Sequence, residues 1–217
     1  MAGRRSLRAV RYSPSPFVGR DSVQTILVGR TRQNVCVVAE SEFVRPLVRL
    51  AGRHEASELA VLHRRTAIAG YGHIFPPEAP PPTEAEVLAQ WEHWLGADWD
   101  RGRRAFVAAD GGDLIGVVLA GPDPDDARRG QLARLYVAPE RWGEGIGRRL
   151  YDAAIGHLHD QGFTTVTLWV LEENRRARSW YERLGWRPNG TRKTTYAPAG
   201  IEDVGYELTF IGLDAPP

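Results

Sequence analysis

Residues 134–150, with the sequence RLYVAPERWGEGIGRRL, decide the fold of this 217-residue chain. The stretch begins as an alternating strand that ends at Val137, and Pro139 stops the strand. Glycines at positions 143, 145 and 147 then lead directly into a predicted helix over residues 145–161. Glycine has no side chain to keep a ligand away from the backbone, and the N–H groups of a first helical turn have no partner within the helix. The stretch therefore predicts a cradle for an anion such as a pyrophosphate.

Two other phosphate-binding motifs fit this loop less well. The dinucleotide-binding pattern G-x-G-x-x-G needs a glycine where Arg148 stands, although Glu172 after the next strand could serve as its ribose-binding acid. The nucleoside-triphosphate pattern needs a lysine in the loop, and the only lysine of the chain is Lys193. On the loop alone, a glycine-rich turn that binds no ligand stays open as an interpretation.

Composition and charge argue against several classes of protein. The chain has 28 lysines and arginines against 27 aspartates and glutamates, and this balance argues against a nucleic-acid or membrane-surface protein. No apolar run approaches the roughly 20 residues of a membrane-spanning helix, so we expect a soluble protein. Cys36 is the only cysteine, which rules out an intramolecular disulfide and favours a cytoplasmic setting. The histidines lack paired metal-binding spacing, and we predict no metal.

The chain divides into a leader and one domain. Residues 1–43 predict a disordered leader, with a small hairpin over residues 25–28 and 35–39 as the alternative, and residues 44–217 predict the domain. The predicted strands are residues 44–50, 105–109, 114–120, 131–137, 164–170 and 204–211, and the predicted helices are residues 55–69, 83–95, 145–161 and 174–184. This order, βααβββαβαβ, favours a mixed α/β fold whose central sheet has helices on both faces.

Together these motifs resemble the GNAT superfamily of acyl-CoA-dependent N-acyltransferases. Residues 137–139 match its Val-x-Pro turn, residues 142–147 match its pyrophosphate loop, and Asn174 and Tyr181 match its next helix, on which they lie two turns apart. Trp142 departs from the usual glutamine or arginine, which removes one polar contact from a loop that acts through its backbone. The resemblance covers about residues 44–213.

The resemblance implies a site and a reaction. It implies acetyl-CoA as co-substrate and acetyl transfer to a primary amine, on a sheet splayed between two central parallel strands. The splay would free the Val137 N–H to stabilise the oxyanion, and Tyr181 would give a proton to the departing thiolate. The residues implied to contact CoA are Leu135, Tyr136, Val137, Trp142, Gly143, Glu144, Gly145, Ile146, Gly147, Arg148, Asn174 and Tyr181. From the residues alone, Tyr181 is as readily a core tyrosine and Asn174 a plain N-cap.

The general base and the acceptor stay open. No carboxylate lies on the strand over residues 131–137, and the candidates elsewhere are His73, Glu78, Glu92, His93 and Glu207. A non-catalytic acyl-CoA-binding sensor or structural module of the same fold is the alternative function. We expect a small-molecule or peptide amine as acceptor, and neither a membrane nor nucleic acid as partner. The acyl chain length and the oligomeric state, a homodimer included, stay open.

Overall fold

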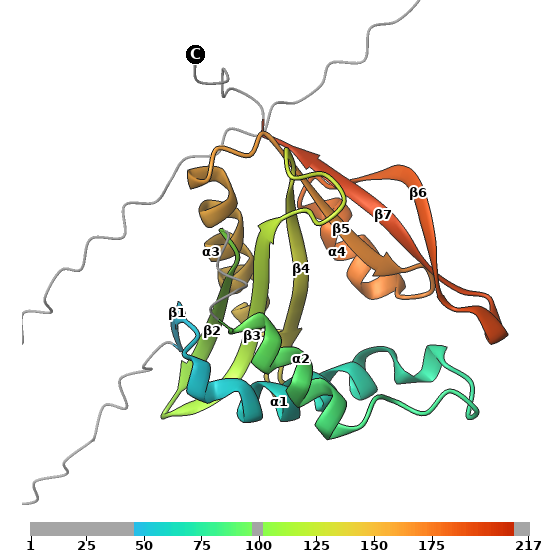
Figure 1. The fold of residues 1–217 in the computed structure, drawn as a ribbon, viewed down its shortest axis with the longest axis horizontal. Helices are drawn as coiled ribbons and strands as arrows, with labels where there is room; N and C mark the ends of the chain where they lie inside the picture. The colour runs from blue at the N-terminus through green and yellow to red at the C-terminus, as the bar shows by residue number, and fades with distance from the viewer. Residues whose placement is uncertain (1–45, 97–101, 211–217) are drawn as a thin grey trace, which may run out of the picture. The chain divides into compact units, whose positions relative to one another are not determined.

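The computed structural model describes residues 46–96 and 102–210, which are built on a seven-stranded sheet of order β1-β2-β3-β4-β5-β7-β6 (Figure 1). The strands are β1 (Leu47–Leu50), β2 (Arg104–Asp110), β3 (Asp113–Pro122), β4 (Gly130–Val137), β5 (Thr165–Leu171), β6 (Arg187–Tyr196) and β7 (Ile201–Thr209). The helices are α1 (Ala56–Tyr71), α2 (Glu84–Trp94), α3 (Ile146–Asp160) and α4 (Arg175–Arg183), with 3-10 turns η1 (Arg53–Glu55), η2 (Gly72–Ile74), η4 (Pro139–Arg141) and η5 (Ala197–Ala199). Only β4 and β5 pair in parallel among these strands.

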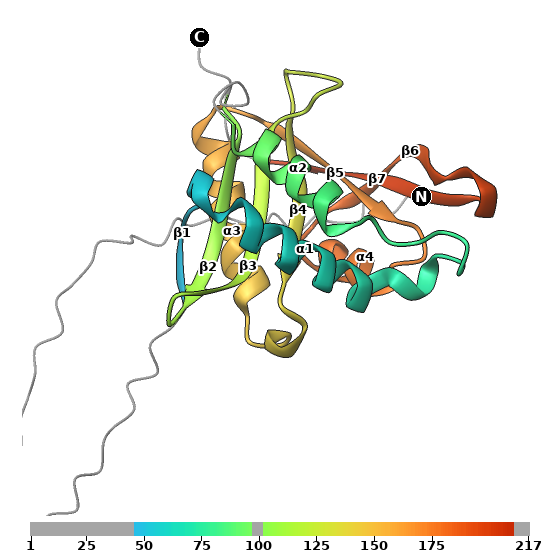
Figure 2. The same cartoon turned by 60° about the horizontal axis from the view of Figure 1, so that its bottom comes forward.

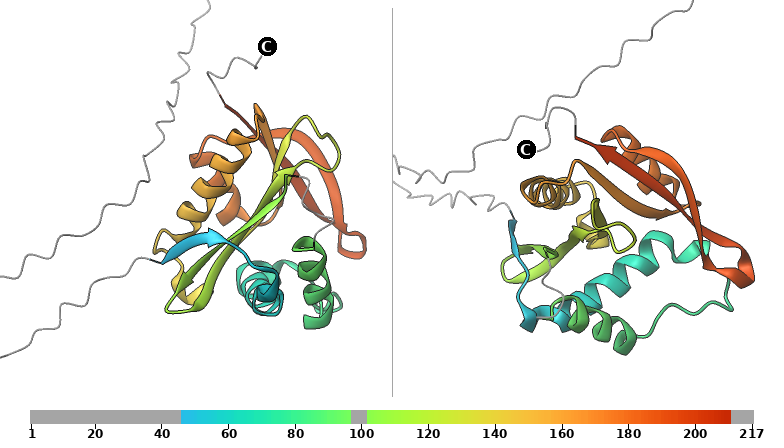
Figure 3. Two further views of the ribbon diagram at one scale, coloured as in Figure 1. Left: turned by 60° about the vertical axis from the view of Figure 1, so that its left-hand side comes forward. Right: turned by 45° about the horizontal axis from the view of Figure 1, so that its top comes forward.

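Helices cover both faces of the sheet, as predicted. Helices α1 and α2 lie on one face, and α3 and α4 lie on the other (Figures 2 and 3). The alternation of side chains along β4 explains the arrangement, because neighbouring residues point to opposite faces. Tyr136 stacks on His63 of α1, with ring centroids 4.2 Å apart. Val137 faces α3, since a Cβ on Gly147 would lie 3.6 Å from its Cγ2 atom.

The predicted helices and strands are all present, but the predicted order lacked one strand. β6 pairs with β7 at the edge of the sheet, and nearly all of its residues are exposed. A strand exposed on both faces has no hydrophobic alternation, so its sequence reads as a loop. The observed order is therefore βααβββαβαββ. The predicted leader over residues 1–43, its alternative hairpin and Cys36 lie outside the described residues.

The parallel pair β4–β5 is joined at one end only. The register pairs Gly130 with Val166 and Gln131 with Thr167, and beyond these positions the two strands separate. The predicted splay between two central parallel strands is thus confirmed.

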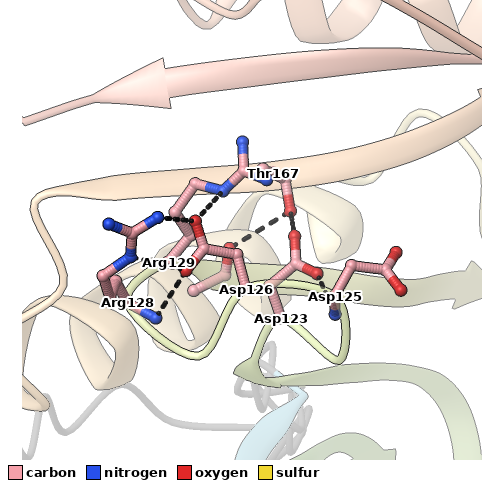
Figure 4. A network of polar contacts seen from close by, with 7 residues as sticks. Asp123, Asp125, Asp126, Arg128, Arg129 and Thr167 are labelled. Atoms are coloured by element: carbon pink, nitrogen blue, oxygen red, sulfur yellow. Dashed lines mark hydrogen bonds and ion pairs between the residues drawn. The ribbon is translucent and has the colours of Figure 1, made fainter.

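Polar contacts hold the closed end of this splay (Figure 4). The Thr167 hydroxyl donates a hydrogen bond to Asp123 Oδ2 at 2.5 Å, and both residues are buried. In the same turn between β3 and β4, Asp126 accepts from the Arg128 side chain at 2.9 Å. A buried carboxylate without a donor would be costly, so Thr167 and Asp123 fix β5 against the end of β3.

Candidate functional site

A cleft of about 700 Å³ opens where β4 and β5 separate. Its walls include β4 from Leu132 to Tyr136 and β5 from Trp169 to Leu171. Asn174, just before α4, and Tyr181, within α4, also line it. The C-terminal part of α1 and the segment that follows it line the opposite side. Because residues from both faces of the sheet line one cleft, a long ligand can pass through the plane of the sheet.

The loop after β4 presents backbone N–H groups without partners. Gly143 and Gly145 adopt φ values of +92° and +78°, a left-handed conformation that favours glycine. Among the described residues, the N–H groups of residues 143–147 form no backbone hydrogen bond, and the Arg148 N–H is the first to reach the Gly145 carbonyl, at 3.1 Å. A Cβ at Gly143 or Gly145 would meet nothing within 4 Å, so the space above the loop is open. This geometry fits a pyrophosphate.

The charged side chains around the loop do not oppose the binding of an anion. The first turn of α3 contains no acidic residue. Glu144, which is in the loop, pairs with Arg141 at 2.8 Å, and Arg141 also reaches Asp110 at 2.9 Å. The one carboxylate of the loop is therefore neutralised locally, and the positive end of the helix dipole faces the open space.

The register of β3 and β4 places the Val137 N–H on the open side of β4. The Ala138 N–H donates to the Ile115 carbonyl at 2.9 Å, so the antiparallel pattern turns the backbone groups of Val137 away from β3. They face the side on which β5 has already separated from β4. Leu135, two residues earlier, has the same orientation and lines the cleft.

Trp142 holds Val137 in place. Its indole N–H donates to the Val137 carbonyl at 2.7 Å, and the Thr66 hydroxyl donates to the same oxygen at 3.3 Å. The Arg176 guanidinium lies 4.3 Å from the centroid of the indole ring. The departure from the family pattern at Trp142 thus has a structural role that the sequence did not indicate.

Tyr181 and Asn174 meet at the cleft. Tyr181 is 8% exposed and packs against Trp180 and Trp186, with ring centroids at 5.1 and 5.9 Å. No hydrogen bond joins its hydroxyl to another described residue, and burial raises its pKa above the usual value. The Asn174 side chain accepts from the Ala177 N–H at 3.1 Å, so Asn174 is the N-cap of α4 and also lines the cleft. Tyr181 is therefore both a packed core residue and a residue that lines the cleft.

Some of the predicted site residues line the cleft, and others do not. The predicted residues that line it are Leu135, Tyr136, Asn174 and Tyr181. Val137 and residues 142–148 do not line it and come directly after the part of β4 that does. Among the candidate bases only His73 lines the cleft. The others lie elsewhere: Glu78, Glu92, His93 and Glu207.

Two polar residues of the cleft, His63 and Asp203, were not among the predicted site residues. His63 is 7% exposed, its Nδ1 atom has no hydrogen-bond partner among the described residues, and burial lowers its pKa to about 4. The sequence could have indicated that His63 is buried, because His63 lies beside Leu59 and Leu62 on the buried face of α1. Asp203 is the only carboxylate of the described residues that lines the cleft. It reaches the cleft through the pairing of β7 with β5, which no local pattern reveals.

The described residues share the fold of solved acetyltransferase structures, one of which is in complex with coenzyme A. The profile of the acetyltransferase (GNAT) family matches residues 66–186. The chain therefore belongs to the GNAT family.

Curated relatives match this chain over about half of its length. A probable N-acetyltransferase of Mycobacterium tuberculosis is 36% identical over 106 residues, which are 48% of this chain and 59% of that protein. A mycothiol acetyltransferase of Propionibacterium freudenreichii subsp. shermanii is 36% identical over 107 residues, which are 48% of this chain and 34% of that protein. The chain thus spans only part of the length of either relative.

Solved structures share the fold at low sequence identity. The ribosomal-protein-alanine N-acetyltransferase of Brucella melitensis superposes with a TM-score of 0.61 at 18% identity, over 76% of this chain and 99% of that one. The PaiA N-acetyltransferase of Thermoplasma acidophilum, in complex with coenzyme A, gives 0.55 at 17% identity, over 76% and 98%.

Two kinds of feature are absent from the described residues. None of their helices is both long and apolar enough to cross a membrane. In this part of the chain, no three or more histidines, cysteines or acidic residues gather as a metal site would require.

Proposed function

We propose that this protein is an acetyl-CoA-dependent N-acetyltransferase that acts on a primary amine. One observation carries the proposal: Leu135 and Tyr181 line the cleft that opens where β4 and β5 separate, and β4 continues beyond this cleft into the loop whose N–H groups have no backbone partner among the described residues. The names of the relatives, N-acetyltransferase and mycothiol acetyltransferase, support the same class of reaction.

The loop and β4 would bind the co-substrate. The free N–H groups of residues 143–147 suit the pyrophosphate of CoA. Leu135 and Tyr136 line the cleft between this loop and Tyr181, where the pantetheine arm would extend. Asn174 closes the same wall at the start of α4.

Backbone and side-chain groups would assist the chemical step. The amine attacks the thioester carbonyl, the new C–N bond forms, the C–S bond breaks to release the CoA thiolate, and the attacking nitrogen loses one proton to water or to a base. The Val137 N–H would stabilise the oxyanion, and the Leu135 N–H is a second donor with the same orientation. Tyr181 would donate a proton to the thiolate, and its raised pKa keeps the hydroxyl protonated at neutral pH.

Replacing Gly145 with valine tests the cradle. Saturating acetyl-CoA at 100 times its Kd should stabilise the wild type by about 2.7 kcal/mol, or about 5–10 °C in Tm. Gly145→Val should abolish this shift, because its side chain would occupy the open space above the loop. Gly162→Val, just beyond the other end of α3, has a left-handed φ of +83° and also nothing within 4 Å of its Cβ, so it is the matched control and should keep the shift.

Two further measurements complete the test. Dephospho-CoA should still stabilise the wild type, because the loop recognises the diphosphate. Release of free CoA in the presence of primary amines should be catalytic. An unchanged shift in Gly145→Val would sink the assignment of the loop, whereas binding without turnover across a broad amine panel would favour the non-catalytic acyl-CoA-binding protein.

A further inference from the structure

The chain places its only lysine in the cleft. The Lys193 ammonium lies 4.5 Å from the centroid of the Trp169 ring and 3.7 Å from Asp203 Oδ2. The three residues come from β6, β5 and β7, and the sheet register brings them together. Asp203 pairs with Leu171 of β5 and with Lys193 of β6, and Trp169 is two residues before Leu171. We call Trp169, Asp203 and Lys193 the ammonium site.

The ammonium site is on the side of the sheet that faces α1. The Tyr206 hydroxyl contacts Glu182 of α4 at 2.7 Å, and Asp203 is an odd number of residues away on the same strand. Side chains alternate along a strand, so Asp203 points to the opposite face. Tyr71 and Tyr136 line the same cleft as Asp203. Burial raises the pKa values of both tyrosines, and the negative charge of Asp203 adds to the effect.

The contact between Lys193 and Asp203 is one in which another cation can replace the Lys193 ammonium. The Asp203 side chain is only 16% exposed, while the Lys193 side chain is 49% exposed. Their 3.7 Å separation is too long for a hydrogen bond, so water or another cation can compete for the carboxylate. A ring face and a buried carboxylate together are the usual surroundings of a bound ammonium group.

The other cations of the cleft are engaged elsewhere. The Arg64 side chain donates to the Pro82 carbonyl at 3.0 Å. The Arg134 guanidinium lies 5.1 Å from the centroid of the Trp94 ring. Neither contact involves Asp203, the one carboxylate that lines the cleft within residues 46–96 and 102–210.

We propose that the ammonium site binds a positively charged amino group of the acceptor, and that Lys193 occupies the site as an internal competitor until the acceptor displaces it. The proposal rests on the proposed function and names its substrate class, a compound with at least two amino groups. The site stabilises a protonated amine, which has no lone pair to attack a thioester. The amine bound there is therefore not the one that is acetylated, and a second, deprotonated amino group of the same acceptor reaches the thioester.

A matched pair of amines tests the proposal. Diaminobutane has an amino group at each end, and butylamine has only one. For the wild type, kcat/KM should favour diaminobutane by about tenfold or more. Asp203→Asn should bring this ratio close to one, mainly through a higher KM for diaminobutane. Lys193→Met, which keeps an unbranched chain without the charge, should lower the KM for diaminobutane because the competitor is gone.

Control variants separate the site from general effects of charge and folding. Glu202→Gln removes the neighbouring carboxylate of β7, which pairs with Arg192 at 2.6 Å outside the cleft, and should leave the ratio unchanged. If Asp203→Asn does not fold, Trp169→Leu should show the same loss of preference. Equal kcat/KM for the two amines in the wild type, with no change in Asp203→Asn, would overturn the ammonium site and leave the proposed function intact.

Calorimetric binding of diaminobutane to the protein alone needs no turnover. Binding that Asp203→Asn weakens about tenfold, without acetylation of any amine, would support the ammonium site and contradict the proposed function. Acetylation of butylamine with no measurable binding of diaminobutane would overturn the ammonium site.

Discussion

Removing the hydroxyl of Tyr181 should slow turnover without weakening the fold. Tyr181→Phe keeps the ring that packs against Trp180 and Trp186. The lost hydroxyl has no hydrogen bond to a described residue, so the free energy of unfolding should change by less than about 0.5 kcal/mol. If the hydroxyl acts in the transition state alone, kcat should fall by about 10²–10⁴-fold, and the affinity for acetyl-CoA should stay the same.

Tyr151 provides a matched control, for which we expect a loss of stability and an unchanged kcat. It is 5% exposed, and its hydroxyl accepts a hydrogen bond from the Trp186 indole N–H at 3.0 Å. Tyr151→Phe leaves that buried N–H without a partner, at a cost of about 1–3 kcal/mol. At about 2–4 °C per kcal/mol for a chain of this size, Tm should fall by about 2–12 °C. The kcat of the folded Tyr151→Phe protein should match the wild type.

Both variants should be measured on folded protein, with kcat, acetyl-CoA affinity and thermal unfolding from one preparation. Burial raises the pKa of Tyr181, so ionisation of this hydroxyl should not lower kcat at any pH up to about 10. Near-wild-type kcat of Tyr181→Phe with a good amine acceptor would falsify the proton-donor assignment. A loss of stability in Tyr181→Phe as large as in Tyr151→Phe would contradict the geometry on which the comparison rests.

Three further predictions concern other parts of the chain. Burial lowers the pKa of His63 to about 4, so the unfolded chain binds a proton that the folded one does not, and stability should be lost as pH falls from about 6.5 to 4. His63→Phe should remove about 2 kcal/mol of the loss between pH 7 and pH 5, as measured by urea unfolding, and an equal loss in both proteins would contradict the burial of a neutral His63. Thr167→Val removes one of the two donors to the Asp123 carboxylate, the other being the Asp125 N–H at 2.9 Å, and should cost about 1–3 kcal/mol, whereas an unchanged urea midpoint would mean that this contact does not hold the closed end of the splay. We also propose that residues 1–43 are dispensable, so a chain that begins at Ser41 should fold and turn over acetyl-CoA like the full chain; loss of solubility or activity would show that residues 25–39 contribute to the domain.

Local sequence signals were sufficient for the helices, the glycine-rich loop before α3 and the order of most strands. Thr83 and Glu86 form the capping box that begins α2, and both signals are visible within four residues. The glycines at 143 and 145 are needed where the backbone is left-handed, so the loop too is locally encoded. Patterns of this kind depend on neighbours along the chain, which a sequence displays directly.

Features that depend on pairing across the sheet could not be predicted. β6 is polar on both faces, and only its register with β7 makes it a strand. Asp203 enters the cleft because β7 inserts between β5 and β6, an order that the spacing of apolar residues does not contain. Trp142 was expected to cost the loop a polar contact, yet its N–H reaches back to Val137. Such contacts depend on tertiary geometry, so residue type alone does not predict them.

The separation of β4 from β5 makes the sheet incomplete in the free protein. Beyond Gln131 and Thr167, the facing edges of the two strands carry peptide groups with no strand opposite them. An extended ligand with amide groups of its own, such as a pantetheine arm, would supply hydrogen bonds that a strand normally provides. Deuterium exchange at Leu135 and Val137 should then slow sharply on ligand binding, while Gln131 is already protected in the free protein. The co-substrate would act as a removable part of the protein's own architecture.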